Sequence, residues 1–418
     1  MDTKIQLDET LDYKIKAKRQ SYYRFQKVVQ NTGAESVTIG AAQQVSTFEI
    51  PAVPLSLARS HLNFETASVA QGAGTYAHLF RNTVPWSRVE LFTRSGVYLM
   101  DVTNFAEMFL TVAQRTKSVE EFHTSDFDVL SRTAINDVNT KKYASSGANA
   151  VHTVSWRVAF RELYDTVLSV DKSIHFNEVL NLRITWREAQ AHGFQNDNAS
   201  PTAGTPADLT GNITVSNLAL FIAAESNPDV VASLAGLVAS GSMPPILMPY
   251  AFIYKTNINN QSSHAISTRF SRGHGRMLER IYTRFQNDDE TKNNRYTALL
   301  SGTEITSFYS LLDSRRMTEF DINVAAVDYH WMREREHAGK VVGLDIANDI
   351  GDFSWGDSWC QNDVECARKG EIAGLSLEGS EVKYDIYINC NGAQSKNYYT
   401  VAVCQRMLQV TPSGLIVS

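Results

Sequence analysis

The stretch SFYSLLDSRRMTEFDINV, Ser307–Val324, joins two different hydrophobic patterns in one continuous run. Its first part has apolar residues three and four positions apart, the spacing of one helix face, so a short helix is predicted over 307–317. Its second part alternates apolar and polar residues, which predicts a half-buried strand. Arg315, Arg316 and Glu319 would then lie at the corner between helix and strand.

Three apolar residues of the predicted strand should face a core. Replacing the first of them, Phe320, by Asp should therefore prevent folding, because an unpaired charge would be buried. The pair Arg315 and Arg316 is a candidate for contact with another subunit. Surface ion pairs within the same domain, of small energetic value, explain this pair equally well. The predicted core markers are Phe320, Ile322 and Val324.

Short alternating runs with turn residues between them recur on both sides of this stretch. PWSRVELFTRSGVYLMDV, residues 85–102, is typical of a hairpin, with Gly96 supplying the turn geometry. A short helix is predicted near 103–116, where apolar residues share one face. Strands do not alternate regularly with helices of ten or more residues, which argues against α/β folds. The sequence therefore predicts an all-β protein.

The chain divides where an apolar stretch interrupted by Gly and Pro, residues 226–249, separates two sets of strand patterns. The spacing of strands and turns in each half is typical of a sandwich or barrel. The predicted organisation is an N-terminal basic arm over 1–30, a first β-domain over 31–228 and a second over 229–418.

The N-terminal segment LDYKIKAKRQSYYRFQKVVQ, residues 11–30, has no acidic residue between Lys14 and Lys27. It is either a solvated amphipathic helix on its own domain, or an arm that reaches a neighbouring subunit, an anionic membrane or nucleic acid. In the second interpretation its cations are candidates for a subunit interface or an inward-facing surface. These cations are Lys14, Lys16, Lys18, Arg19, Arg24 and Lys27.

Composition limits the classes of function. The chain has 418 residues, of which 43% are hydrophobic, so it can bury a sizeable core. Its net charge of -6 argues against a nucleic-acid-binding role for the whole surface. No secretory signal and no transmembrane helix are expected from the pattern of apolar residues. The four cysteines are therefore predicted to be free, mostly buried thiols.

The usual signatures of catalysis and cofactor binding do not occur in the sequence. Phosphate-binding Gly-x-x-x-x-Gly-Lys, dinucleotide-binding Gly-x-Gly-x-x-Gly and the Gly-x-Ser-x-Gly elbow are missing. The zinc-type patterns Cys-x-x-Cys and His-Glu-x-x-His are missing as well. No catalytic residue, cofactor site or metal site is predicted, and the protein is not expected to be an enzyme.

Several stretches resemble the double jelly-roll major capsid proteins of the PRD1–adenovirus lineage, nearest those of polinton-like viruses, adintoviruses and virophages. PLSLARSHLNFE (54–65) followed by RVELFTRSGVYLMDV (88–102) resembles their first jelly roll. FYSLLDSRRMTEFDINVAAVDYHWMREREHAGKVVG (308–343) resembles the second, and FSWGDSW (353–359) also has a counterpart. Met317 departs from the Leu that is commoner there.

The resemblance implies two tandem eight-stranded jelly rolls with short helical insertions. It also implies a viral major capsid protein that trimerises into pseudo-hexameric capsomers and tiles an icosahedral shell in the virion, after assembly inside the host cell. The implied partners are further copies of the chain, penton and minor capsid proteins, and an internal membrane or the genome through the N-terminal arm. No cofactor is implied.

An alternative function fits the same residue patterns. A viral spike, attachment protein or glycan-binding β-sandwich would also be rich in strands and in aromatic residues, of which this chain has 17 Tyr and 6 Trp. An enzyme on a cupin-like sandwich is a third class, but no strand carries the His-x-His of a cupin metal site. Self-assembly into shells, glycan binding and metal content distinguish the three.

Overall fold

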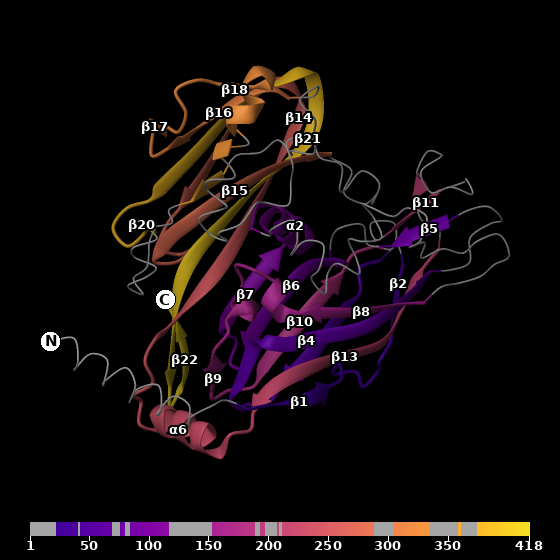
Figure 1. Ribbon diagram of the computed structural model, residues 1–418, viewed down its shortest axis with the longest axis vertical. Helices are drawn as coiled ribbons and strands as arrows, with labels where there is room; N and C mark the ends of the chain where they lie inside the picture. The colour runs from indigo at the N-terminus through magenta and orange to yellow at the C-terminus, as the bar shows by residue number, and fades with distance from the viewer. Residues whose placement is uncertain are drawn as a thin grey trace, which may run out of the picture.

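A computed structural model of the chain shows two β-sandwiches, one before and one after helix α6 (Pro228–Ala239) (Figure 1). The prediction of an all-β fold is confirmed. The structure describes residues 22–40, 42–68, 76–79, 84–116, 153–188, 193–196, 207–208, 211–287, 305–330, 332–333, 358–360 and 374–418.

The first sandwich has the strand order of a jelly roll. One layer runs β1-β13-β4-β8 and the other β3-β10-β6-β7. Numbered along the chain, these strands lie in the orders 1-8-3-6 and 2-7-4-5, which two Greek keys produce. Short strands β2 (Val37–Ile39) and β9 (Ser173–Ile174) extend the first layer. The bounds are β1 (Tyr23–Val28), β3 (Val45–Ile50), β4 (Leu55–Ser68), β6 (Trp86–Thr93), β7 (Tyr98–Thr103), β8 (Thr153–Ala159), β10 (Leu180–Trp186) and β13 (Ile213–Glu225).

Alternation along β10 explains how this sandwich fills its core. Every second residue of LNLRITW is buried, and the residues between them are half-buried. At its end, the ring of Trp186 meets Phe64 edge-on at 5.4 Å and Trp86 at 6.4 Å. The Trp186 indole N–H donates to Ser46 Oγ at 2.9 Å, so this large buried ring leaves no polar atom unsatisfied.

The second sandwich repeats the same strand order with two strands that belong to both layers. The first layer is β14-β21-β15-β19, and the second uses the other ends of the two long strands, in the order β14-β21-β16-β18. Register shifts between Ile258 and Ser263 mark where the paired long strands pass from one layer to the other. The bounds are β14 (Ile246–Phe270), β15 (Met277–Asn287), β16 (Ile305–Leu312), β18 (Ile322–Asn323), β19 (Ser358–Cys360) and β21 (Val382–Thr411).

Three short strands complete this sandwich. They are β17 (Arg315–Arg316), β20 (Leu375–Ser376) and β22 (Gly414–Val417). A separate small sheet joins loops of the first sandwich and contains β5 (Tyr76–Leu79), β11 (Gly193–Asn196) and β12 (Ala207–Asp208). The prediction of two tandem jelly rolls is confirmed by the repeated strand order.

The predicted helix over 307–317 is wrong. Residues 305–312 form strand β16, and β17 pairs back onto it after a turn at Asp313 and Ser314, which both have positive φ. Within β16 the Phe308 side chain points into the core opposite Ile388. Pairing with β21 supplies the backbone hydrogen bonds that a helix would have made internally, so tertiary contacts override local spacing.

The predicted core strand is shorter than expected. Only Ile322 and Asn323 form β18, and Ile322 is 1% exposed. Phe320 is 44% exposed, so its prediction as a core residue is wrong. It lies in a bend before β18, where the alternation of a strand does not apply, and its ring packs edge-on against Tyr329 at 4.9 Å. The side chain of Val324 lies outside the described part.

The predicted hairpin and helix in the first half are confirmed. Strands β6 and β7 pair around Gly96, whose φ is +93°, and helix α2 (Phe105–Thr116) follows directly.

Part of the segment predicted as a basic arm is not an arm, because residues 23–28 form strand β1 and pair with β13. The division of the chain at 228/229 stays a prediction; α6 begins there.

Helix α2 lies between the two sandwiches (Figure 1) and contacts β15 and β21 of the second one. Its apolar face shares one core cluster with Tyr282, Val401 and Val403, which point out of the second sandwich. Neighbouring residues such as Ala402 and Cys404 belong to the second sandwich's own core. The outer face of the layer β14-β21-β15 is therefore buried against the first sandwich.

A buried ion pair crosses the same junction. Arg280 Nη1 of β15 lies 2.8 Å from Asp165 Oδ1, which belongs to the loop between η1 (Phe160–Glu162) and η2 (Val167–Ser169). Arg280 also pairs with Glu279 at 3.3 Å. Burial raises the pKa of Asp165 against the opposing effect of Arg280. Burial raises the pKa of Glu279 in the same way.

Candidate assembly surfaces

No element among the described residues covers the outer face of the first sandwich's layer β1-β13-β4-β8. Alternation along β4 turns Leu62 and Phe64 into the core and His61 to the outside. On this face the His61 ring stacks on Phe221 of β13 at 5.1 Å and meets Phe25 of β1 edge-on at 5.2 Å. Phe25 is 50% exposed. We call this surface the first outer face.

A hollow of about 650 Å³ opens on the first outer face. Three of its lining side chains are arginines and one is an aspartate, so the hollow is cationic. Two aromatic residues of β1 and His61 line it as well. Its lining residues are Tyr23, Phe25, Ala58, Arg59, His61, Arg157, Ala159, Arg161, Ser169 and Asp171.

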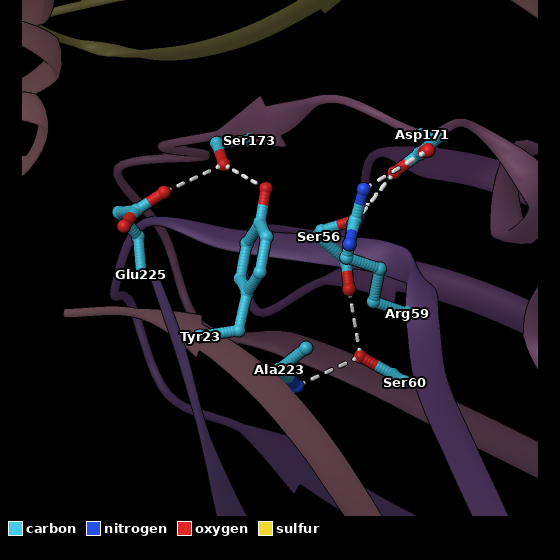
Figure 2. Close-up of polar contacts among 8 residues, drawn as sticks. All are labelled: Tyr23, Ser56, Arg59, Ser60, Asp171, Ser173, Ala223 and Glu225. Carbon is cyan, nitrogen blue, oxygen red and sulfur yellow. Dashed lines mark hydrogen bonds and ion pairs between the residues drawn. The ribbon is translucent and has the colours of Figure 1, made fainter. Parts of the chain in front are cut away.

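A bulge in β4 directs Arg59 into this hollow. Opposite Phe221 and Ala223 of β13 stand His61 and Ser56, so β4 carries extra residues between them. Ser60 Oγ closes the bulge: it accepts from the Ala223 N–H at 3.0 Å and donates to the Ser56 carbonyl at 2.8 Å. Figure 2 shows this arrangement with Arg59 projecting beside it.

Hydrogen bonds and an ion pair hold aromatic and cationic residues of the hollow in place (Figure 2). Arg59 pairs with Asp171, with Nε 3.1 Å from Oδ1, and its guanidinium lies 4.9 Å from the centroid of the Tyr23 ring. The Tyr23 hydroxyl lies 2.8 Å from Ser173 Oγ, which donates to Glu225 Oε2 at 3.1 Å. Strand β1 is thus fixed at an edge of the layer by side chains as well as by its pairing with β13.

Two further arginines leave positive charge at the rim. Arg161 pairs with its neighbour Glu162 at 3.3 Å and stays exposed. The Arg157 side chain is exposed, and within the described ranges it makes no ion pair or hydrogen bond. Arg157 also lines a second hollow of about 450 Å³ on the same face. This charge is available for an acidic partner.

A second exposed surface lies on the second sandwich, at residues 313–330 and 332–333, which we call the corner segment. It contains three exposed large apolar side chains and, after β18, helical residues at 327–330 and 332–333. His330 of this helix is fully buried, its ring 5.2 Å from that of Phe308, so the helix is anchored to the sandwich. The exposed apolar residues are Phe320, Tyr329 and Met332.

The candidate residues from the sequence fall in separate places. Arg24 and Lys27 are exposed on β1, and Lys27 Nζ pairs with Glu35 at 2.6 Å. Arg315 and Arg316 lie on β17, at the opposite end of the molecule from β1 in Figure 1. Arg316 pairs with Asp321 and lies 4.4 Å over the Tyr309 ring, which are contacts within the domain. Lys14, Lys16, Lys18 and Arg19 lie outside the described residues.

Sequence reasoning missed the residues that build both surfaces. In the sequence, Arg59 and His61 are two polar residues at alternate positions of an apparently regular strand. The side chains point to the first outer face because of the bulge in β4, which the sequence does not indicate. Tyr329 and Met332 follow the predicted strand without a clear period. One signal in the sequence could have indicated the first outer face. In YRFQK of β1, aromatic residues alternate with charged or polar ones, a pattern that a solvated helix does not need.

The described residues contain no cluster of three or more metal-ligating side chains. Among the same residues, none of the helices combines the length and apolar character of a membrane span. Cys390 and Cys404 are free thiols. Burial raises the pKa of the Cys404 thiol to about 12, so this group is unreactive at neutral pH.

Comparison with solved structures identifies the arrangement of the two sandwiches. The mavirus major capsid protein matches with a TM-score of 0.54 at 10% identity, over 94% of this chain and 90% of that one. PBCV-1 VP54, fitted into a reconstruction of the virophage Sputnik, gives 0.57 at 10%, over 96% and 98%. The Faustovirus major capsid protein gives 0.53 at 9%, over 94% and 91%.

These similarities span both sandwiches and establish a double jelly-roll fold. No protein-family model matches the sequence, and no curated protein sequence matches it either.

Proposed function

We propose that this chain is the major capsid protein of a virus. In this role it is a structural subunit without catalytic activity that trimerises into pseudo-hexameric capsomers, and these tile an icosahedral shell. The observation that carries the proposal is the repeated strand order of the two sandwiches, together with end-to-end similarity to solved capsid proteins.

The geometry suits a shell for a physical reason. Two similar sandwiches in one chain mean that three copies present six similar lobes, and a six-lobed plate can pack into a hexagonal lattice. Closed rotational symmetry requires that each copy uses the same two surfaces toward its neighbours. The first outer face and the corner segment are two such surfaces on different sandwiches.

The test is the assembly state of the purified protein. We expect a homotrimer by light scattering and a six-lobed outline in electron micrographs, with sheets or shells at higher concentration. A monomer that binds glycans on an array, and never forms a trimer, would instead support the attachment or glycan-binding alternative. The aromatic and cationic hollow on the first outer face is where such a glycan would be sought.

We also propose that the basic residues before β1 face the inside of the shell. There they would meet an internal membrane, the genome or a minor capsid protein, while penton proteins occupy the vertices. Replacing the four cations Lys14, Lys16, Lys18 and Arg19 by Ala should leave trimers intact. It should lower binding of the trimer to anionic vesicles, or to nucleic acid, and unchanged binding to both would contradict an interior electrostatic role.

A further inference from the structure

We infer that the corner segment of one copy docks on the first outer face of a second copy of this chain. The inference rests on the proposed capsid function and assigns the two surfaces that join neighbouring subunits. Its basis is a contact that the chain already makes internally, between its own two sandwiches.

The internal contact pairs a helix with a sheet face. Helix α2 follows the fifth strand of the first jelly roll, β7, and it contacts the outer face of the second jelly roll's layer β14-β21-β15. That outer face contributes Tyr282, Val401 and Val403 to the shared core cluster. The helix of the first jelly roll thus packs on the outer sheet face of the second jelly roll. We call a sheet face in this position a receiving face.

Each partner of this contact has a counterpart elsewhere in the chain that no described element covers. The counterpart of α2 is the helix of the corner segment, which follows β18, the fifth strand of the second jelly roll. The counterpart of the receiving face is the layer β1-β13-β4, because it has the same place in the strand order as β14-β21-β15. Within the described part of the chain, one copy therefore carries a helix and a sheet face that have no partner of the kind that α2 and the layer β14-β21-β15 find in each other.

The chemistry of both surfaces matches this assignment. The corner segment exposes Phe320, Tyr329 and Met332, at 44%, 43% and 52%. The first outer face has the exposed Phe25 and the hollow beside it. Apolar side chains that water surrounds on both surfaces would be buried by the contact.

Charge is complementary as well. The corner segment has four acids and three arginines, and one of these arginines, Arg333, is buried. Its exposed or half-buried charged residues are Asp313, Arg315, Arg316, Glu319, Asp321 and Asp328. The hollow on the first outer face has three arginines and one aspartate among its lining residues. The rim cation Arg157 and the exposed acids Glu319 and Asp328 have no ion pair within the described residues. Opposite charges steer the two surfaces together and oppose pairing of like surfaces.

The contact joins different surfaces on the two copies, so it is a head-to-tail contact. Such contacts form closed rings when the rotation between copies closes, and open filaments when it does not. Repetition of the internal sandwich-to-sandwich rotation would bring each second sandwich onto the first sandwich of the next copy. The ring then has alternating internal and intermolecular junctions of similar geometry.

Cysteine cross-linking between differently tagged copies tests the contact directly. One chain carries Phe25→Cys and the other carries Met332→Cys, and the two are expressed together. Mild oxidation should produce a disulfide between the two tags in the trimer. The matched control replaces Phe25→Cys by Tyr98→Cys, at an exposed position on β7. Equal cross-linking with the control, or none with Phe25→Cys, would overturn the inference.

A second test measures trimer dissociation. Tyr329→Asp with Met332→Asp, and separately Phe25→Asp, should raise the concentration at which half the trimer dissociates by at least tenfold. Ile416→Asp, at an exposed position of β22, is the matched control and should leave it unchanged. Under conditions that keep the chain monomeric, circular dichroism and melting should match the wild type in every variant, because all of these side chains are exposed.

The outcomes separate this inference from the proposed function. A wild-type protein that never trimerises contradicts the proposed function itself. A stable wild-type trimer whose dissociation is insensitive to the corner and Phe25 substitutions contradicts only the surface assignment.

Discussion

Phe320 and Ile322 are two positions apart, so an alternating strand would place both side chains on the same face, but their surroundings in the structure differ. Ile322 is 1% exposed within β18, whereas Phe320 is 44% exposed in the bend before it. A period of two predicts burial only where residues lie in one continuous strand, and this strand is too short to include both. The alternation in sequence was correct for one residue and misleading for the other.

The two positions make a matched pair for one substitution. Ile322→Asp should lower the free energy of unfolding by roughly 3–5 kcal/mol, because it buries a charge without a partner. Phe320→Asp should change it by no more than about 0.5 kcal/mol, because the new carboxylate stays in water. Chemical denaturation of both variants under conditions that keep the chain monomeric measures the difference. Equal losses would contradict the exposed position of Phe320.

The junction between the sandwiches predicts an unusual dependence of stability on pH. Asp165 and Glu279 have raised pKa values in the folded state, so the folded protein binds their protons more tightly than the unfolded chain does. Their contribution to stability is therefore fully present below the ordinary pKa values of 3.8 and 4.5, and it is lost as pH rises through the raised values.

The double variant Asp165→Asn with Glu279→Gln isolates this contribution. The free energy of unfolding of the wild type minus that of the variant should increase as pH falls from 7 toward 4. Unfolding curves at several pH values check the slope, and Arg59→Gln, which removes an exposed ion pair with Asp171 and a contact with the Tyr23 ring far from the junction, is the control. A difference that decreases with falling pH would contradict the assignment of burial as the dominant cause.

At the scale of elements, the hairpin β6–β7 was predictable and strand β16 was not. The hairpin is specified locally, because Gly96 with positive φ and the alternation on both sides lie within one short stretch. The helical spacing in 307–317 is equally local, but β16 pairs with β21, which is distant in the sequence. A single sequence gives no information about that partner, and the partner decides between helix and strand.

Two glycines in different elements should respond to alanine in opposite directions. Gly96→Ala should destabilise the protein by about 1 kcal/mol, because its φ of +93° is strained for any residue with a Cβ. Gly236→Ala should stabilise it by about 0.5–1 kcal/mol, because Gly236 is an exposed position inside α6 with space for a Cβ. Thermal melting of the two variants and the wild type measures both effects. A stabilising Gly96→Ala would contradict the turn geometry.

For the whole molecule, the sequence predicted two β-domains but not how they meet. The division into two sets of strand patterns follows from composition and periodicity. The junction depends on which face of each layer points outward, and this is set by details such as the bulge at Ser60 and the register shifts in β14. The sequence left the Arg pair at 315–316 open between a contact with another subunit and an ion pair within the domain. In the structure Arg316 contacts Asp321 and Tyr309 of its own domain, and a role of the pair at an interface stays a prediction.

The two sandwiches should unfold together. Residues of both sandwiches belong to one core cluster that runs through the junction. Unfolding of one sandwich would therefore expose apolar side chains of the other, so the two should lose their structure in one transition. Scanning calorimetry at fixed protein concentration should show one transition with equal calorimetric and van't Hoff enthalpies. Arg280→Ala should lower its midpoint without splitting it. Two separated transitions in the wild type would contradict a continuous core.

The long strands β14 and β21 also have a mechanical consequence. They are hydrogen-bonded to each other from Ile246 with Leu408 to Phe270 with Val382, through both layers of the second sandwich. A force that pulls along this ribbon loads many backbone hydrogen bonds in shear at once, instead of opening them one after another. In the first sandwich the two layers are built from separate strands. In the proposed shell, internal pressure would therefore load the second sandwich along this ribbon.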